Sequence, residues 1–466
     1  TQTSYDGRNR QQCVAVRMNP AIFVSLPAGA CQMGTTGPDG PDRISRTYYD
    51  TEGRVAKIQQ GFGTTLQRDY ATYTYTDNGQ RKSVTDARGY RSDLRYDGYD
   101  RLRRWVFPNP QALATVNEAD FEEYTYDKNG NRTQLRKRDG SLILSQYDAL
   151  NQLTLKSVSA PPSLSYLHKR NVYYAYDMRG LQLYARFDSH SGEGEVHDYD
   201  RYGRNIYTTS AYDGMARHMA RFYDDGGRLV TLVHLNDIQV FYYNYQPDGQ
   251  PNQVFDTAGQ VLVDFNYNER AEITGAVRNA AAPDQAFTYD SLGRLASNAI
   301  TNGPAPVSWS FTRNKASQII SETQSNDAYS WTAHVPTDIA YMANGLNQYD
   351  EVAGVTFCYD ANGNLTADNT HAYVYDVENR LVEMRARVGT ICPASYGGTI
   401  QAMLRYDTAG RLFEITNYAG GVATNVSRLR YDGDALVAEY NGSNQLVRRH
   451  AHGPAAGDDP LVSYEG

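Results

Sequence analysis

The sequence of 466 residues has no long apolar run and no excess of positive charge. A helix that crosses a membrane needs about 18 or more consecutive apolar residues. No such run is present, so no membrane span is expected. Acidic residues outnumber basic ones by 53 to 45, which leaves a net charge of −8. Domains that bind nucleic acid usually carry a basic surface, so no nucleic-acid partner is expected.

The sequence also lacks the short motifs that accompany common catalytic sites. There is no Gly-x-Ser-x-Gly elbow, no His-Glu-x-x-His pair and no glycine-rich loop of the kind that holds a phosphate. Carboxylates are numerous, but their spacing does not indicate the paired acid and base of a glycosidase. We therefore expect no catalytic residue and no cofactor, and the chain is not predicted to be an enzyme.

Metal-binding patterns are weak. Asp127–Asn131 and Asp360–Asn364 imitate the start of a calcium loop, but the twelfth position, which should be a bidentate glutamate, is Arg138 in one case and His371 in the other. Turn formation explains both segments without a metal. The pair within His450–His452 supplies two imidazoles, although a zinc site needs further ligands. No metal site is predicted.

Cysteine is scarce, with four residues in the chain, and none is spaced as in a Cys-x-x-Cys or Cys/His zinc motif. Cys13 and Cys31 enclose a segment that contains proline and glycine, whereas Cys358 and Cys392 lie further along the chain. If the protein is exported, a disulfide between Cys13 and Cys31 is expected, and closing a loop of this length contributes about 3 kcal/mol. The alternative is that these thiols are buried and free.

Tyrosine, in contrast, is abundant, with 39 residues against 13 phenylalanines. Aromatic residues recur every 22 positions at Tyr223, Tyr245, Tyr267, Tyr289 and Phe311. A fixed period of about 20–50 residues indicates a repeat architecture. The chain is therefore predicted to use one supersecondary unit many times.

A turn motif, Tyr-Asp-x-x-Gly-Arg, follows many of these aromatic residues. Its aspartate can bond to the backbone ahead of it, and its glycine supplies a left-handed conformation that other residues adopt at a cost. Its arginine is free to pair with a turn carboxylate or carbonyl. We expect a purely architectural role for the turn residues Asp50, Gly53, Arg54, Asp224, Gly227, Arg228, Asp290, Gly293, Arg294, Asp407, Gly410 and Arg411.

The segments between turns have the pattern of β-hairpins. Leu229–Leu235 and Ile238–Tyr245, both rich in branched and aromatic residues, flank the turn signal at Asn236-Asp237. Aromatic residues two positions apart, such as Tyr243 and Tyr245, share one face of a strand and are expected to stack in ladders across repeats. An open sheet of more than about ten strands must curl, split or close. A long ribbon of such hairpins is therefore expected to coil.

The repeat pattern divides the chain into four regions within one continuous array. Residues 1–44 form a decorated N-terminal repeat with a Pro/Gly-rich insertion, 45–311 the main array, 312–345 degenerate repeats and 346–466 the C-terminal repeats. The terminal repeats of such an array are usually polar and atypical, and these are not. We therefore expect the 466 residues to be a portion of a longer polypeptide.

The recurring Tyr-Asp-x-x-Gly-Arg-Leu resembles the YD repeat of bacterial rearrangement-hotspot (Rhs) proteins, of the BC components of Tc toxins and of animal teneurins. Arg430–Tyr440 and His452–Pro454 also resemble bacterial Rhs-repeat polypeptides. The resemblance implies an all-β fold, in which a long antiparallel ribbon coils into a hollow, barrel-like spiral shell. The plug and self-cleavage segments of toxin-carrying relatives are not recognisable, since Asp459-Pro460 is too short a match.

The resemblance implies a structural, non-catalytic segment of a secreted or cell-surface bacterial protein that encloses or presents an effector or toxin domain. Its partners would be that domain or further parts of the same polypeptide. The alternative is a cell-surface adhesion or glycan-binding protein, in which tyrosines and long loops of the same ribbon contact carbohydrate. Stacking against other copies of the chain is a further option, because a truncated ribbon exposes strand edges.

Overall fold

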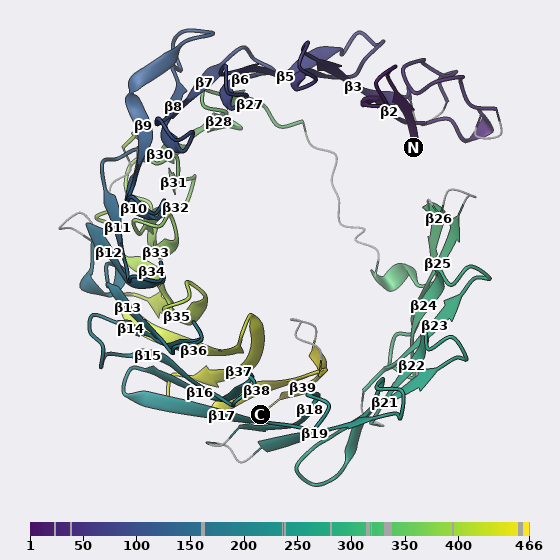
Figure 1. Ribbon diagram of the computed structural model, residues 1–466, viewed down its shortest axis with the longest axis vertical. Helices are drawn as coiled ribbons and strands as arrows, with labels where there is room; N and C mark the ends of the chain where they lie inside the picture. The colour runs from purple at the N-terminus through teal and green to yellow at the C-terminus, as the bar shows by residue number, and fades with distance from the viewer. Residues whose placement is uncertain are drawn as a thin grey trace. The chain divides into compact units, whose positions relative to one another are not determined.

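Strands dominate the computed structural model (Figure 1). It describes residues 1–465 other than 23–24, 38–39, 160–163, 235, 237–238, 280–281, 314–316, 318, 330–337, 394–395 and 455–459. The predicted all-β antiparallel ribbon is confirmed: strands that follow one another in the chain pair antiparallel, in sheets of 26, three and ten strands.

The 26-stranded sheet contains β1 (Gln2–Tyr5), β2 (Gln11–Val16), β3 (Arg43–Tyr49), β4 (Val55–Gln60), β5 (Arg68–Tyr75), β6 (Arg81–Asp86), β7 (Arg91–Tyr96), β8 (Leu102–Pro108), β9 (Val116–Tyr126), β10 (Arg132–Arg136), β11 (Leu142–Tyr147), β12 (Leu153–Ser159), β13 (Val172–Tyr176), β14 (Gln182–Phe187), β15 (Gly194–Tyr199), β16 (Asn205–Tyr212), β17 (Met215–Tyr223), β18 (Leu229–His234), β19 (Gln239–Tyr245), β20 (Pro251–Phe255), β21 (Val261–Tyr267), β22 (Ile273–Arg278), β23 (Asp284–Tyr289), β24 (Leu295–Thr301), β25 (Val307–Arg313) and β26 (Ile319–Gln324).

The three-stranded sheet contains β27 (Tyr341–Ala343), β28 (Tyr349–Val352) and β29 (Val355–Thr356). The ten-stranded sheet contains β30 (Cys358–Tyr359), β31 (Leu365–Ala367), β32 (His371–Tyr375), β33 (Leu381–Ala386), β34 (Ile400–Tyr406), β35 (Leu412–Ala419), β36 (Val422–Asp432), β37 (Ala435–Asn441), β38 (Leu446–His452) and β39 (Pro460–Glu465). The helices are short 3-10 turns: η1 (Pro20–Ile22), η2 (Tyr166–His168) and η3 (Asp327–Tyr329).

The pairing of β23 with β24 shows how a repeat is built. Their register runs from Asp284 opposite Thr301 to Tyr289 opposite Leu295, with a shift between Thr288 and Tyr289. A short turn followed by a left-handed residue produces this one-residue bulge in a hairpin. The same shift occurs at the repeat tyrosines Tyr49, Tyr75, Tyr223, Tyr245 and Tyr406.

The predicted hairpin on either side of Asn236-Asp237 is formed by β18 and β19, in which Thr231 lies opposite Tyr242. Asp237 itself is outside the described residues. In the region predicted to be degenerate, β25 and β26 still pair, with Phe311 opposite Glu322. Ala316, Trp331 and Pro336, on which that prediction rested, are outside the described residues.

Two compact units can be distinguished. Unit 1 comprises Thr1–Leu144, Ile339–Asn369 and Gly389–Ala394, and unit 2 comprises Ser145–Asp338, Thr370–Val388 and Ser395–Gly466. In unit 2 we call Ser145–Asp338 the early stretch and the two later segments the late stretch. The boundaries of these units differ from those of the four regions defined by the repeat pattern. The reason is that each unit joins parts of the chain that are distant in sequence.

Unit 2 contains two clusters of buried side chains to which both stretches contribute. In one, Phe413 of the late stretch packs with Tyr212 and Phe187 of the early stretch. In the other, Ala451 packs against a larger group from β18–β22 that includes Phe241 and Val263. The strands of the two stretches accordingly lie alongside each other (Figure 1).

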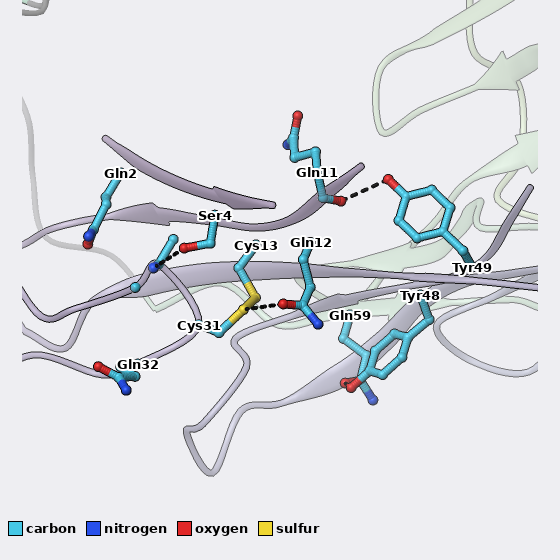
Figure 2. Close-up of a disulfide and its surroundings, with 12 residues drawn as sticks. Gln2, Ser4, Gln11, Gln12, Cys13, Cys31, Gln32, Tyr48, Tyr49 and Gln59 are labelled. Carbon is cyan, nitrogen blue, oxygen red and sulfur yellow. Dashed lines mark hydrogen bonds between the residues drawn. A yellow bond between two sulfur atoms is a disulfide. The ribbon is translucent and has the colours of Figure 1, made fainter. Parts of the chain in front are cut away.

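In unit 1, a small core surrounds a disulfide bond between Cys13 on β2 and Cys31 in the following loop, with an S–S distance of 2.06 Å (Figure 2). Cys13, Ala15 and Ile44 are almost fully buried there. The loop is also attached to β1, because Ala30 N donates to Ser4 Oγ at 2.7 Å. A second disulfide bond, which was not predicted from the sequence, joins Cys358 and Cys392.

Candidate functional site

Where the turn after a repeat tyrosine begins with aspartate, the side chain of that aspartate closes the turn. In Asp290–Arg294, Oδ1 of the aspartate accepts hydrogen bonds from the backbone N–H groups of Leu292 (2.9 Å) and Arg294 (3.1 Å), and Oδ2 accepts one from Arg294 Nε (2.7 Å). Gly293 N donates to Asp290 O at 3.0 Å. The same aspartate–arginine contact occurs in the other three predicted turns, Asp50–Arg54, Asp224–Arg228 and Asp407–Arg411.

The glycine of each predicted turn has a positive φ: 88° at Gly53, 81° at Gly227, 76° at Gly293 and 86° at Gly410. Other turns place asparagine at the equivalent position, with φ of 63° at both Asn151 and Asn379. Asparagine tolerates this left-handed conformation better than most residues, and β-branched residues are its least tolerant occupants.

We expect Gly293→Val to reduce the free energy of unfolding by about 1–3 kcal/mol, because a β-branched residue is strained at positive φ. A Cβ at this position would also lie 2.7 Å from Glu272 Oε1, which would have to move. Gly293→Asn is the matched control, and its loss should be clearly smaller. Denaturant unfolding of both variants measures the difference, and equal stabilities would contradict the left-handed turn.

The arginine of one turn covers the tyrosine of the next repeat. The guanidinium of Arg228 lies over the ring of Tyr245, with 4.7 Å between Cζ and the ring centroid, and the Tyr245 hydroxyl donates to Leu229 O at 2.7 Å. Such a cation–π contact stabilises by about 0.5–1 kcal/mol at exposed sites. The same pair of contacts joins Arg54 to Tyr75, Arg204 to Tyr223 and Arg411 to Tyr431. Consecutive turns are thus linked along the ribbon.

This arginine–tyrosine contact replaces the tyrosine ladders expected from the sequence. Among the described residues, Tyr341 and Tyr349 form a direct tyrosine–tyrosine pair, at 4.9 Å between ring centroids, whereas repeat tyrosines such as Tyr75, Tyr245 and Tyr431 contact arginine. The sequence contained a signal for this contact, since an arginine ends many of the turns and a tyrosine ends the hairpin that follows. The sequence reasoning assigned that arginine to its own turn alone.

Because of the turn aspartates, the stability of the folded chain is expected to fall at acid pH. The side-chain hydrogen bond from Arg294 and then its backbone N–H hold the pKa of Asp290 down at about 2, and Arg10 does the same for Asp6, also to about 2, against a usual 3.8. Because folding lowers these pKa values, the stabilisation is complete above about pH 4 and is lost as the pH falls towards 2.

We expect the melting temperature to fall steadily between about pH 4 and pH 2, since the aspartates of many turns are protonated there. Asp290→Asn should make the decline shallower, because asparagine does not titrate. Thermal unfolding followed by circular dichroism across this range measures the effect. A melting temperature that stays constant from pH 4 to pH 2 would contradict it.

In unit 2, turns of the late stretch pack against hairpin ends of the early stretch. Tyr212, at the end of β16, is 1% exposed and stacks on Phe413 at 4.7 Å between ring centroids. Its hydroxyl lies 3.3 Å from the Thr408 hydroxyl, inside the turn Asp407–Arg411. The predicted turn residue Arg411 pairs with Glu195 of the early stretch as well as with Asp407.

Charged groups surround this contact. Arg405 Nη1 lies 2.7 Å from Asp213 Oδ2 and 3.2 Å from Glu414 Oε1. Burial works against the charge of Arg411, but the facing carboxylates of Glu195 and Asp407 outweigh it and raise the pKa of the guanidinium. Arg411 therefore stays charged, and the two stretches are held by paired charges around an aromatic stack.

Unit 1 shows the same arrangement on a smaller scale. Arg88 Nη2 donates to Ala343 O at 3.1 Å, and Asp139 N donates to Asn362 Oδ1 at 3.1 Å. Asn362 belongs to the turn Asp360–Asn364, one of the two segments that imitate a calcium loop. Packing of later turns on earlier hairpin ends is thus present within each unit.

A cavity of about 900 Å³ lies between the two stretches of unit 2. Tyr223, Tyr243, Tyr245 and Arg228 of the early stretch line it, together with Asp432 and His452 of the late stretch. Its volume falls within the range of about 300–1,000 Å³ typical of small-molecule sites. The tyrosine hydroxyls point into the wall, since Tyr243 donates to His452 O at 3.3 Å and Tyr223 to Asn205 O at 3.0 Å. The cavity therefore offers aromatic surfaces and few free polar groups.

Of the predicted turn residues, Gly227 and Arg228 line this cavity and Arg411 lies at the contact with Glu195. The turn at 290–294 does not line the cavity, and the turn at 50–54 belongs to unit 1. The structure therefore distributes the predicted residues along the ribbon instead of gathering them into one site. The residues missed by sequence reasoning are Tyr212 and Phe413, which carry no motif.

The candidate metal ligands are engaged with neighbouring groups. His450 Nδ1 lies 2.8 Å from Ser463 Oγ, and His452 Nε2 lies 2.7 Å from Leu436 O. Asp127 Oδ1 accepts from the backbone of Asn129 and Asn131 in its own turn. In the described part of the chain, no group of three or more histidine, cysteine or acidic residues is placed to hold a metal ion. The described helices are likewise all too short or too polar to cross a membrane.

No protein-family model matches the sequence. Over 242 residues the chain is 25% identical to the tRNA3(Ser)-specific nuclease WapA of Bacillus spizizenii and 24% identical to the tRNA nuclease WapA of Bacillus subtilis. Each match covers 52% of this chain and 9% of the relative, so the chain spans less than a tenth of the length of these proteins.

The fold is similar to that in the crystal structure of TcdB2-TccC3. The match covers 97% of this chain and 28% of that chain, with a TM-score of 0.50 and 12% sequence identity. At this identity the likeness concerns the fold alone.

Proposed function

We propose that this chain is a structural, non-catalytic segment of a secreted or cell-surface bacterial Rhs-type protein, and that its ribbon forms part of a wall around an effector domain. The packing of late turns on early hairpin ends is the observation that supports this proposal. A ribbon whose later turns pack on its own earlier hairpin ends leaves fewer of those ends exposed to solvent. It also makes a continuous surface that can separate a passenger from proteases.

The proposal is tested by limited proteolysis of the full-length polypeptide encoded by the gene. Segments outside residues 1–466 should resist protease in the intact protein. Replacing Arg405 and Arg411 by methionine should expose them, because the charge pairs that join the two stretches are lost. Equally rapid digestion of those segments in the parent and in the variant would overturn the proposal.

A glycan-binding role is the second candidate, and the tyrosine-lined cavity of about 900 Å³ is the observation that favours it. Aromatic side chains in a cavity of this size can contact a small saccharide. A glycan array of the parent and of Leu229→Trp, which would fill part of the cavity, separates the two functions. Specific glycan binding by the parent that is lost in the variant would support the adhesion function. Absence of glycan binding by the parent would exclude that function.

A further inference from the structure

A buried histidine lies where the early and late stretches of unit 2 meet. His168 ends the short helix η2 of the early stretch and is 7% exposed. It lines a cavity of about 20 Å³, which is also lined by the turn Asp376–Arg380 and by Val382 of the late stretch. The imidazole is therefore enclosed between the two stretches.

The ring of His168 lacks the partners that a charged imidazole needs. Its Nε2 is buried and has no hydrogen-bond partner among the described residues. A cavity needs about 10–15 Å³ of such space to hold a water molecule, so the space beside the ring holds about one. A protonated imidazole donates from both of its nitrogens, and one water molecule cannot replace the hydration of a cation. The surroundings thus fit a neutral ring.

The two carboxylates that act most strongly on His168 are already paired with arginines. Asp376 is 5% exposed, and its Oδ2 accepts a hydrogen bond from Arg380 Nε at 2.7 Å. Glu383 on β33 accepts one from Arg385 Nε at 2.8 Å. Neither carboxylate is therefore a free counter-ion for a protonated ring.

The other charged groups around the ring are paired as well. These contacts join Glu378 to Lys156 (2.8 Å) and Arg380 (3.0 Å), Arg170 to Asp188 and Glu193 (both 2.7 Å), and Arg405 to Asp213 (2.7 Å) and Glu414 (3.2 Å). Tyr406 also lines the cavity, and its hydroxyl donates to Leu381 O at 2.9 Å. A positive charge on His168 would thus enter a set of groups whose charges already balance.

Protonation of His168 is therefore unfavourable while the two stretches are packed together. Burial, the largest influence, lowers the pKa of this histidine from its usual 6.5, and the positive charges of Arg405 and Arg380 lower it further. The carboxylates of Glu383 and then Asp376 raise the pKa without cancelling the effect of burial. Because folding lowers this pKa, the stabilisation is complete well above pH 6.5 and is lost progressively as the pH falls below that value.

We propose that His168 is a pH-sensitive latch between the early and late stretches of unit 2. While the ring is neutral, η2 packs against the turn Asp376–Arg380. At mildly acid pH the ring takes up a proton, and the charge is hydrated only when η2 separates from that turn, so the contact opens locally. The turn aspartates act at lower pH, below about pH 4. The latch depends on the contact between the stretches and not on the proposed wall function.

Hydrogen exchange of the chain Thr1–Gly466 between about pH 7 and about pH 5.5 tests the latch. Exchange is followed by mass spectrometry and corrected for the intrinsic effect of pH on amide exchange. Peptides that contain η2 or the turn Asp376–Arg380 should lose protection by about fivefold or more. The reason is that a ring which is neutral only in the packed state shifts the opening equilibrium by up to about tenfold for each pH unit below 6.5.

His168→Gln does not titrate in this range and should abolish the pH dependence of these peptides, even if it lowers their protection at every pH. His197→Gln is the matched control, because burial also lowers the pKa of His197, which does not line the cavity. This control should keep the full pH dependence. If His168→Gln does not fold, His168→Leu, with an apolar side chain in the same place, takes its part in the comparison.

Three results would overturn the latch. One is protection that stays constant between the two pH values in the parent, and another is an equal loss in the His168 variants. The third is greater protection at acid pH, because it would mean that the protonated ring pairs with Glu383 or Asp376 and tightens the contact. The proteolysis test of the proposed function, done at neutral pH, does not depend on this proton, so the two proposals can fail separately.

Discussion

Replacing Tyr212 by alanine is expected to reduce the free energy of unfolding of unit 2 by about 3–5 kcal/mol, the range typical of a large aromatic side chain removed from a core. Tyr212 is 1% exposed and stacks on Phe413 of the late stretch. The truncation would leave a cavity where the early and late stretches meet. Denaturant unfolding, followed by circular dichroism, measures the loss.

Two further variants separate packing from hydrogen bonding at this position. Tyr212→Phe keeps the stack but removes the contact with the Thr408 hydroxyl, so the expected loss is about 1 kcal/mol. Tyr202→Ala removes a tyrosine that is 67% exposed and should change stability little. If Tyr212→Ala unfolds at the same denaturant concentration as Tyr202→Ala, the stack does not hold the two stretches together.

Removing the disulfide between Cys13 and Cys31 should reduce stability by about 3 kcal/mol, because closure of the intervening loop restricts the unfolded chain. The two residues are 18 positions apart. Cys13→Ala/Cys31→Ala is the appropriate variant, since Cys13 is 1% exposed and a serine hydroxyl there would be buried. Unfolding of the variant is compared with that of the parent under oxidising conditions.

The control for this experiment is Cys358→Ala/Cys392→Ala, which opens a loop of 34 positions. Its loss should be similar or slightly larger, because the entropy of loop closure grows slowly with length. Thiol titration of the unfolded parent without reductant should detect no free thiol. Free thiols at Cys13 and Cys31, or a double variant as stable as the parent, would contradict the disulfide.

The local features of the fold were predictable because they depend on residues that are close in sequence. The turn Asp290–Arg294 is specified by an aspartate that bonds to its own backbone and by a glycine at positive φ. The interval of 22 positions between aromatic residues from Tyr223 to Phe311 then predicted one supersecondary unit used many times. These two signals were sufficient to predict an all-β antiparallel ribbon.

The contacts between stretches could not be predicted, because no periodic signal connects residues so far apart. Tyr212 and Thr408 are separated by 196 positions, and neither belongs to a recognisable pair in the sequence. Arg411 and Glu195 are 216 positions apart, and their ion pair forms only when the turn Asp407–Arg411 lies beside the early stretch. The chemistry of the cavities therefore depends on how the ribbon packs on itself.

The contact between the arginine of a turn and the tyrosine of the next repeat affects how such a chain can change length. Since Arg228 and Tyr245 belong to adjacent repeats, a duplication or loss of one whole hairpin with its turn reconstitutes the same junction on both sides. An insertion of one residue within a strand instead turns every later side chain of that strand to the opposite face. Genes for such ribbons can thus lengthen or shorten by whole repeats while the remaining arginine–tyrosine contacts between repeats are kept.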